Sequence, residues 1–257
     1  MGVINVSPES LLSPTASVEN ALARGMQLVT EGANILDIGG EATRPYTPPI
    51  SAEEELNRVI PAIRALKKSV NVPLSIDTKK AVVAKAALEE GVAMINDVSG
   101  FTDPEMRKVA KESGVPICIM HMQGTPADMQ TNPSYPKGVA TEIKEWFTQQ
   151  IDLLLNEGVK ASQIILDPGF GFGKTVAHNL EILQNLAEFK RMGFPVLVGV
   201  SRKSFIARIL QKRAEEILPA TLALTAIALL ADVDILRVHD VLETSDVVNV
   251  VRAYRTA

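Results

Sequence analysis

The segment Ile35-Leu36-Asp37-Ile38-Gly39-Gly40-Glu41-Ala42-Thr43-Arg44-Pro45 joins a short apolar run to a polar cluster. The same order, an apolar run that ends in reactive side chains, occurs eight times along the chain. The runs are Met1–Val6, Ile35–Ile38, Pro73–Ile76, Ala93–Ile95, Pro116–Met120, Gln163–Leu166, Pro195–Val200 and Ile235–Val238. A closed (β/α)8 barrel buries its parallel strands and gathers reactive groups where the strands end. The pattern therefore predicts this α/β fold, the TIM barrel.

The segments between these runs have the character of helices that end at a glycine. Such glycines stand just before the next apolar run, at Gly32, Gly91, Gly114, Gly158 and Gly193. Glycine adopts the left-handed conformation at a helix end without steric cost. At the start of one helix, Ser51 and Glu54 predict a reciprocal capping box. Strands that alternate with helices of this length pair in parallel through right-handed crossovers.

An open, doubly wound sheet is the main alternative fold. Eight strand–helix units fill a closed barrel, and no Gly-x-Gly-x-x-Gly turn follows the first strand, so the barrel is favoured. The length of 257 residues is close to the ~250 that is typical of one such barrel. We therefore expect a single domain over residues 1–257.

Composition argues against several classes of protein. Hydrophobic residues make up 46 % of the chain and charged residues 22 %, as in soluble domains with a large core. The net charge of −4 argues against a nucleic-acid partner. No apolar run reaches the ~18 residues of a membrane span, and no signal peptide precedes the first strand, so a cytoplasmic protein is expected. The single cysteine, Cys118, is expected to be a small buried side chain.

The strand ends carry two groups of polar side chains. Asp77, Asn96 and Asp167 belong to the third, fourth and sixth strands. Carboxylates and an amide around one cavity match the donors and acceptors of a flat, nitrogen-rich heterocycle. Arg237 and His239 stand two apart on the last strand, so both side chains point the same way. Together with Asn5 they suit a phosphate or pyrophosphate, which barrels often bind near the last two strands.

Other motifs allow more than one interpretation. Lys203, in Ser201–Ser204, would hydrogen-bond a ring carbonyl or form a Schiff base, as in a lyase of the aldolase kind. The segment Gly169–Thr175 lacks the spacing of a phosphate loop and predicts a flexible lid with an aromatic surface. His121 is expected to brace the loop that follows it, and Asp103 to cap a helix. Cysteine and histidine show no metal-ligand spacing, but Mg²⁺ that arrives with pyrophosphate needs only one or two protein oxygens.

Eight motifs follow one another in order along almost the whole chain. They are Met1–Ser10, Asp37–Pro45, Ser75–Thr78, Ile95–Gly100, His121–Pro126, Leu166–Lys174, Ser201–Phe205 and Arg237–Val241. Together they resemble the motifs of the dihydropteroate synthase family. The resemblance implies a transferase of folate synthesis that joins 6-hydroxymethyl-7,8-dihydropterin pyrophosphate to 4-aminobenzoate and releases pyrophosphate. It also implies a sulfonamide target and a homodimer, to which the apolar segment Leu222–Leu230 would contribute, although a core helix has the same pattern.

The resemblance also implies roles for individual residues. The pterin would be held by Asp77, Asn96, Asp167 and Lys203. The leaving pyrophosphate would be bound by Asn5, Arg237 and His239, with Mg²⁺ at Asn5. Thr43, Arg44 and Pro45 would belong to a second loop, and the aminobenzoate side would include Phe170, Arg202 and Ser204. The residues expected to stabilise the departing charges, and so to be catalytic, are Asp77, Asp167, Lys203, Arg237 and His239.

The first loop departs from the family pattern. Leu11 stands where the family has phenylalanine, and Ser13 where it has a second acid, within the segment Glu9–Pro14. The departure predicts weakened aminobenzoate binding. Two alternatives to an active synthase are therefore a pterin-binding domain of the methyltransferase kind and a pterin-binding protein without catalytic activity.

Overall fold

The structure is a computed structural model, and it describes residues 1–7, 17–43 and 47–257. Eight short strands in this part of the chain alternate with helices. Six strands pair in parallel in their sequence order: β1 (Gly2–Asn5), β2 (Leu36–Gly39), β3 (Leu74–Asp77), β4 (Met94–Asp97), β5 (Ile117–Met120) and β6 (Ile164–Asp167). The remaining two, β7 (Leu197–Val198) and β8 (Ile235–Leu236), also pair in parallel.

Two backbone bridges close the strands into a ring. Leu166 on β6 bridges to Val196, next to β7, and Gly2 on β1 bridges to Val238, just beyond β8. Across the second seam, Val3 N donates a hydrogen bond to Val238 O (3.1 Å), and Val238 N donates one to Met1 O (2.9 Å). The strands thus form the predicted closed (β/α)8 barrel and not an open sheet.

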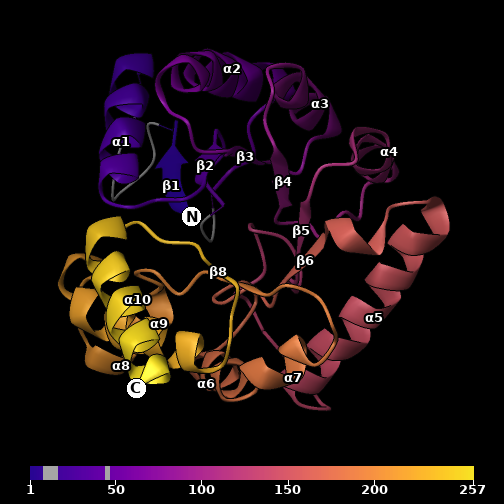
Figure 1. Cartoon of the computed structure of the whole chain (residues 1–257). Coiled ribbons are helices and arrows are strands. Elements are labelled where there is room, and N and C mark those ends of the chain that lie inside the picture. Colours follow the sequence, from indigo (N-terminus) through magenta and orange to yellow (C-terminus); the bar gives the residue numbers. More distant parts are fainter. Residues whose placement is uncertain (8–16, 44–46) are drawn as a thin grey trace.

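The helices form a ring around the strands, as Figure 1 shows. They are α1 (Val18–Thr30), α2 (Ala52–Ser69), α3 (Ala81–Glu89), α4 (Pro104–Ser113), α5 (Val139–Glu157), α6 (Val176–Gln184), α7 (Leu186–Lys190), α8 (Ser204–Leu210), α9 (Leu218–Leu230) and α10 (Val241–Thr256), with short 3-10 turns at η1 (Ala161–Gln163) and η2 (Ala214–Glu216). None of the helices in the described ranges is long and apolar enough to cross a membrane.

The predicted helix ends are largely confirmed, with one correction. Gly114 and Gly158 cap α4 and α5 in the left-handed conformation. Ser51 Oγ accepts a hydrogen bond from Glu54 N (3.1 Å), as expected. The Glu54 carboxylate does not return to Ser51, because it pairs with Arg58 one turn further along α2. The reciprocal half of the capping box is therefore wrong.

Two hydrophobic clusters lie on opposite sides of the strands. The larger cluster packs outward-facing strand residues such as Ile38 and Ile76 against the helices. The smaller one fills the middle of the barrel with Met94, Cys118, Ile165 and Leu197. Cys118 is a free, fully buried side chain, as predicted. These apolar residues fill the middle of the barrel. Because the strands are parallel, their polar ends lie together at one end of it.

Candidate active site

Polar side chains replace hydrophobic ones where the strands end. The strand register places Asn5, Gly39, Asp77 and Asn96 side by side on β1 to β4. Side chains alternate along a strand, so Asn5, Asp77 and Asn96 all turn towards the barrel interior. Asp167 ends β6 and is buried in the same way. The structure therefore brings together the residues that were expected to hold a heterocycle.

Asp37, one layer deeper on β2, connects these groups. Its Oδ2 accepts hydrogen bonds from Asn96 Nδ2 (3.0 Å) and from Arg237 Nε (2.6 Å). The side chain is fully buried, and its Oδ1 has no hydrogen-bond partner among the described residues. Asp37 is missing from the predicted site residues, although a charged residue within an apolar strand was the signal that could have identified it.

Arg237 points into the barrel. Besides its bond to Asp37, its NH2 group donates to Asp77 Oδ2 (2.6 Å). Burial works to lower the pKa of Arg237, but the charges of Asp37 and Asp77 outweigh it and hold the pKa above the ordinary value. In this structure the Arg237 guanidinium neutralises two carboxylates. Its contact with pyrophosphate stays a prediction, and the arginine would have to make that contact while paired with Asp37 and Asp77.

His239 lies at the end of β8 beside β7. Its Nδ1 is 3.0 Å from Ser201 Oγ, and its backbone oxygen accepts a hydrogen bond from Arg24 (2.7 Å). Burial, followed by the charge of Arg237, lowers the pKa of His239 to about 4. The ring is therefore neutral at pH 7, and one of its nitrogens can donate a hydrogen bond to an anion.

Burial raises the pKa of both site carboxyl groups. The pKa of Asp77 rises to about 7, against the opposing charge of Arg237. The pKa of Asp167 is also raised, against a hydrogen bond from Gly169 N (2.8 Å) and the charge of Lys203. Asp77 Oδ1 is buried and has no partner in the part of the chain that the structure describes. Because such an oxygen is costly to bury, it is suited to accept a hydrogen bond from a ligand.

Lys203 contacts the ring of Phe172. Its Nζ lies 4.2 Å from the ring centroid, a cation–π contact that the sequence prediction missed. Burial and the charge of Arg237 lower the pKa of Lys203 to about 8, while Asp167 and Asp77 act in the opposite direction. With a pKa near 8 the amine is mostly protonated at pH 7 and can donate hydrogen bonds.

The glycine loop, residues 169–173 after β6, is tightly packed. Phe170 is buried and stacks on Phe205, with ring centroids 6.2 Å apart. A Cβ atom at Gly169 would lie 2.0 Å from His121 O, and one at Gly173 would lie 2.6 Å from Gln123 O. These glycines are required because the backbone passes close to the segment after β5. The prediction of a flexible lid is therefore wrong, and of the two phenylalanines expected to form its surface, Phe170 is buried and only Phe172 is partly exposed.

Lys174 holds the glycine loop from behind. Its Nζ lies 3.1 Å from His121 Nδ1 and donates to the backbone oxygens of His121 (3.2 Å) and Phe172 (2.8 Å). Burial lowers the pKa of Lys174 well below its ordinary value. Burial and the neighbouring Lys174 lower the pKa of His121 to about 2. The His121 ring thus supports the glycine loop through Lys174, a role that was not predicted for either residue, and bracing of the loop that follows His121 stays a prediction.

The other predicted residues take different positions. The guanidinium of Arg202 makes four hydrogen bonds within the protein, to both carboxylate oxygens of Asp240 and to the backbone oxygens of Ala214 and Glu215. These bonds brace the backbone that follows β7. Contact between Arg202 and aminobenzoate stays a prediction. Ser204 is exposed at the start of α8. Thr43 lines a small cavity with Asp77.

Several predictions concern residues that the structure does not describe. Arg44 and Pro45 of the second loop lie outside the described residues. The altered first loop, Glu9–Pro14 with Leu11 and Ser13, lies outside them as well.

Comparisons with known proteins agree with the barrel and its polar strand ends. The family model described as "Pterin binding enzyme" matches residues 1–239. The chain is 40 % identical over 259 residues to the dihydropteroate synthase of Escherichia coli K12, which covers 100 % of this chain and 92 % of that protein. It is 44 % identical over 245 residues to the dihydropteroate synthase of a Synechocystis species, covering 94 % of this chain and 84 % of that protein.

Solved structures give the same result. A Yersinia pestis dihydropteroate synthase in complex with a sulfonamide drug superposes with a TM-score of 0.97 at 38 % identity, covering 100 % of this chain and 94 % of that one. A Xanthomonas albilineans dihydropteroate synthase with 4-aminobenzoic acid gives a TM-score of 0.93 at 37 % identity, covering 100 % and 93 %. The fold and the family model define a pterin-binding barrel enzyme. The chain belongs to the dihydropteroate synthase family, whose members are transferases.

Proposed function

We propose that the protein catalyses the dihydropteroate synthase reaction, in which 6-hydroxymethyl-7,8-dihydropterin pyrophosphate and 4-aminobenzoate give 7,8-dihydropteroate and pyrophosphate. The observation that carries the proposal is the group of Asp77, Asn96 and Asp167 at the strand ends, with a buried oxygen of Asp77 that has no partner among the described residues. Relatives with this function match the chain over its whole length. The reaction would take place in the cytoplasm as a step of folate synthesis.

The pterin is bound by groups of complementary hydrogen-bonding character. Asp77 and Asp167 accept bonds from N–H groups of the ring, Asn96 both donates and accepts, and Lys203 donates to the ring carbonyl. Asp37 and Arg237 hold Asn96 and Asp77 in place from below. A donor placed against Asp77 Oδ1 favours the ionised carboxylate and so lowers its raised pKa on binding.

The leaving group is received on the side of β1 and β8. The bond between the exocyclic methylene and the pyrophosphate oxygen breaks, and its electron pair leaves with pyrophosphate. Arg237 and His239 stabilise the charge that develops there, while Asp77 and Asp167 stabilise the cation on the methylene and ring. The amine nitrogen of aminobenzoate then forms the new C–N bond and loses a proton to solvent.

A magnesium ion fits the donor chemistry at β1. The amide oxygen of Asn5 is a hard ligand at a strand end, in register with Gly39 on β2 and, across that strand, with Asp77 on β3. Mg²⁺ keeps several waters and usually takes only one or two protein oxygens besides substrate phosphates. When bound with pyrophosphate, it would neutralise part of the charge on the leaving group.

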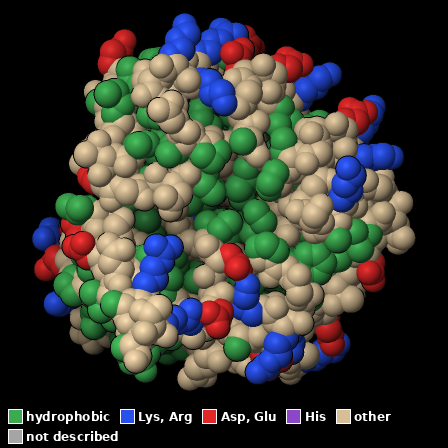
Figure 2. Space-filling model, in the orientation of Figure 1, with side chains coloured by type: hydrophobic (Ala, Val, Ile, Leu, Met, Phe, Trp, Pro, Cys, Tyr) green, Lys and Arg blue, Asp and Glu red, His purple; other side chains and the backbone are tan. Residues whose placement is uncertain are grey.

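A homodimer would use the helices at the end of the chain. Large hydrophobic side chains on α9 and α10 are exposed, among them Ile227, Leu230, Val250 and Tyr254. In the view of Figure 2, hydrophobic side chains gather over the middle and the lower left of the face, and most charged ones stand around its edge. Exposed apolar surface of this kind is typical of contacts between proteins.

The test is an assay for released pyrophosphate with both substrates. We expect turnover by the wild-type protein, and in Asp167→Asn a pterin affinity that is lower by roughly ten- to a hundredfold, since a hydrogen bond to a charged group contributes about 1.5–3 kcal/mol. Calorimetry with a pterin ligand measures that affinity. A folded wild-type protein that binds pterin but releases no pyrophosphate would be a binding protein without catalytic activity, and the proposal would fail.

A further inference from the structure

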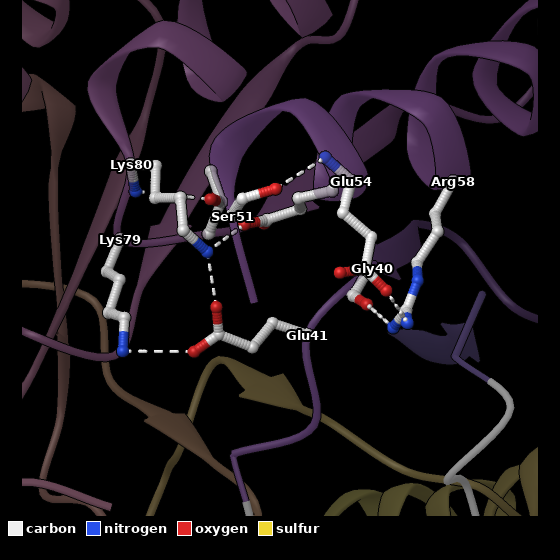
Figure 3. A network of polar contacts seen from close by, with 9 residues as sticks. Gly40, Glu41, Ser51, Glu54, Arg58, Lys79 and Lys80 are labelled. Atoms are coloured by element: carbon white, nitrogen blue, oxygen red, sulfur yellow. Dashed lines mark hydrogen bonds and ion pairs between the residues drawn. The ribbon is translucent and has the colours of Figure 1, made fainter. Parts of the chain in front are cut away.

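A compact charged network connects the residues just after β2 with the first turns of α2. Lys80 Nζ donates hydrogen bonds to both Glu41 and Glu55, and Lys79 Nζ pairs with the other oxygen of Glu41 at 3.0 Å. Figure 3 shows the two lysines of the segment between β3 and α3: Lys79 points towards Glu41, and Lys80 towards both Glu41 and the start of α2. The network contains two acids and two lysines, so its net charge is zero when all four are ionised.

Lys80 connects the two ends of the β2–α2 loop, which spans residues 40–51. Glu41 follows the last residues of β2, whereas Glu55 lies in the first turn and a half of α2. Lys80 itself comes from the next strand–helix unit, at the start of α3. One ammonium group therefore ties the beginning of the loop, its end and a neighbouring unit of the barrel together.

The network is largely removed from water. The side chain of Glu55 is 1 % exposed and that of Glu41 is 8 % exposed, compared with 18 % for Lys80 and 29 % for Lys79. Gly40 packs directly on α2, because a Cβ atom there would lie 2.7 Å from Val59 and 2.9 Å from Glu55. Buried charges hold their partners in a defined geometry, since separating them leaves an uncompensated charge.

The network also borders the candidate active site. A cavity of about 10 Å³, about the room of one water molecule, is lined by Glu41, Thr43, Glu55, Asp77 and Lys79, but not by Lys80. Thr43 is only two residues beyond Glu41 in the sequence. The position of Thr43 beside Asp77 therefore depends on where Glu41 is held.

We propose that Lys80 is a positioning residue for the synthase reaction, which through Glu41 and Glu55 fixes both ends of the β2–α2 loop and so sets Thr43 beside Asp77 for the binding of the pterin substrate. The inference rests on the proposed function. Lys80 is not among the residues that line the cavity beside Asp77. Its contribution is the geometry of the loop, and small displacements of groups that orient a substrate have large effects on rate.

Lys80→Met and Lys79→Met form a matched pair that tests this inference. Both substitutions remove one positive charge from the same network, but among the described residues Lys79 forms an ion pair with Glu41 alone and does not connect the two loop ends. With aminobenzoate saturating, we expect Lys80→Met to raise the KM for pterin pyrophosphate about tenfold and Lys79→Met to change it by less than about twofold. Lys80→Arg, which keeps a donor for both carboxylates, should recover most of the loss.

Hydrogen exchange gives a second readout that does not need turnover. Backbone amides of residues 40–43 and 51–55 should exchange faster in Lys80→Met than in Lys79→Met. If Lys80→Met does not fold, Glu41→Gln weakens the loop start while leaving the Lys80–Glu55 pair in place, and it should raise the same KM.

The outcomes separate the two proposals. A wild-type protein without turnover contradicts the proposed function, and the exchange experiment then still decides the role of Lys80. An active wild type in which Lys80→Met and Lys79→Met have the same KM and the same exchange rates contradicts the inference alone.

Discussion

The β6–α6 loop and the β2–α2 loop are each held by a lysine, but in opposite electrostatic surroundings. Lys174 contacts a histidine nitrogen and two backbone oxygens, none of which carries a full charge. Lys80 meets two carboxylates. The β6–α6 loop also depends on glycines that fit against neighbouring backbone, whereas the described ends of the β2–α2 loop depend on the charged network.

The difference appears in how the two lysines titrate. Burial lowers the pKa of Lys174 well below its ordinary value. Burial acts on Lys80 in the same direction, but the hydrogen bonds to Glu41 and Glu55 outweigh it, and the pKa of Lys80 is raised. One loop is therefore held by shape and neutral hydrogen bonds, and the other by charge. Substitutions, pH and salt should affect the two loops differently.

The largest effect should come from adding a methyl group to the packed loop. In Gly169→Ala the new Cβ would lie 2.0 Å from His121 O, at a residue with φ of 69°. Left-handed strain costs about 1–2 kcal/mol, and overpacking adds about 1–3 kcal/mol. We expect the free energy of unfolding to fall by about 2–5 kcal/mol, and pterin binding to weaken because Gly169 N would leave Asp167. Urea denaturation and calorimetry measure the two effects.

The control for this substitution is Gly114→Ala. Gly114 has nearly the same φ, 67°, but nothing lies within 4 Å of the added Cβ. It should lose only about 1–2 kcal/mol, the strain alone, and keep its pterin affinity. Equal losses in the two variants would mean that the glycine loop moves aside easily, and that it is not held by shape.

The next effect concerns the charged network. Lys80→Met leaves Glu55 buried without its partner, and we expect a loss of roughly 2–3 kcal/mol at pH 7, below the 3–5 kcal/mol of a fully buried pair because Lys80 is partly exposed. Burial alone would raise the pKa of Glu41, but Lys80 and Lys79 hold it below the ordinary value. Its contribution to stability is therefore present above about pH 4.5 and is lost as the pH falls.

The raised pKa of Lys80 sets the upper pH limit of the range in which the charged network stabilises the fold. Its contribution is fully present below about pH 10.5 and is lost as the pH rises through the folded-state pKa. The deficit of Lys80→Met should thus be widest between about pH 5 and pH 10. Urea denaturation at several pH values checks this, and a deficit that persists unchanged at pH 3 would show that the lysine acts through packing.

Lys174→Met should have a smaller effect with the opposite slope. Because the folded-state pKa of Lys174 is lowered, the unfolded chain binds more protons, and wild-type stability gains from Lys174 as the pH rises towards 10.5. The substitution removes that gain. It also leaves the backbone oxygens of His121 and Phe172 without this donor, which costs about 1–3 kcal/mol of stability for each buried group. Removal of a buried amine partly offsets this cost. We expect a net loss of about 1–2 kcal/mol at pH 7 that grows towards pH 10.

The comparison with Lys80→Met is the control for this experiment. Urea is the suitable denaturant, because a salt denaturant would screen the charges that distinguish the two lysines. If the losses in free energy of unfolding of the two variants follow the same pH profile, the two lysines do not differ in how they hold their loops, and the comparison fails.

The sequence predicted the barrel because its signals are local. Each signal can be read from a few consecutive residues: an apolar run, a polar strand end or a glycine at the end of a helix. The eight strands formed where they were expected. Asp77, Asn96 and Asp167 share one end of the barrel because parallel strands all end on the same side. These placements need no knowledge of which side chains meet.

Contacts between distant residues could not be predicted in this way. Asp37 and Arg237 are 200 residues apart, and only the closed barrel shows that they pair. The glycine run suggested flexibility from composition, whereas His121 O and Gln123 O, on another segment, make Gly169 and Gly173 packing requirements. Lys80 likewise finds its partners 25 and 39 residues away.

The smallest effect should be a change in the emission of Trp146, the only tryptophan of the chain. Its ring lies 5.2 Å from that of His121 in an edge-on contact, and His121 is in turn held by Lys174. Removing the lysine frees the imidazole to turn and changes the polarity next to the indole. We expect a small shift of the emission maximum in Lys174→Met, and none in Lys80→Met, whose network lies at β2 and β3. Steady-state fluorescence of the folded variants at pH 7 measures both, and it needs neither substrate nor turnover. A shift of the same size in both variants would mean that the two loops are coupled through the barrel and do not act as independently held parts.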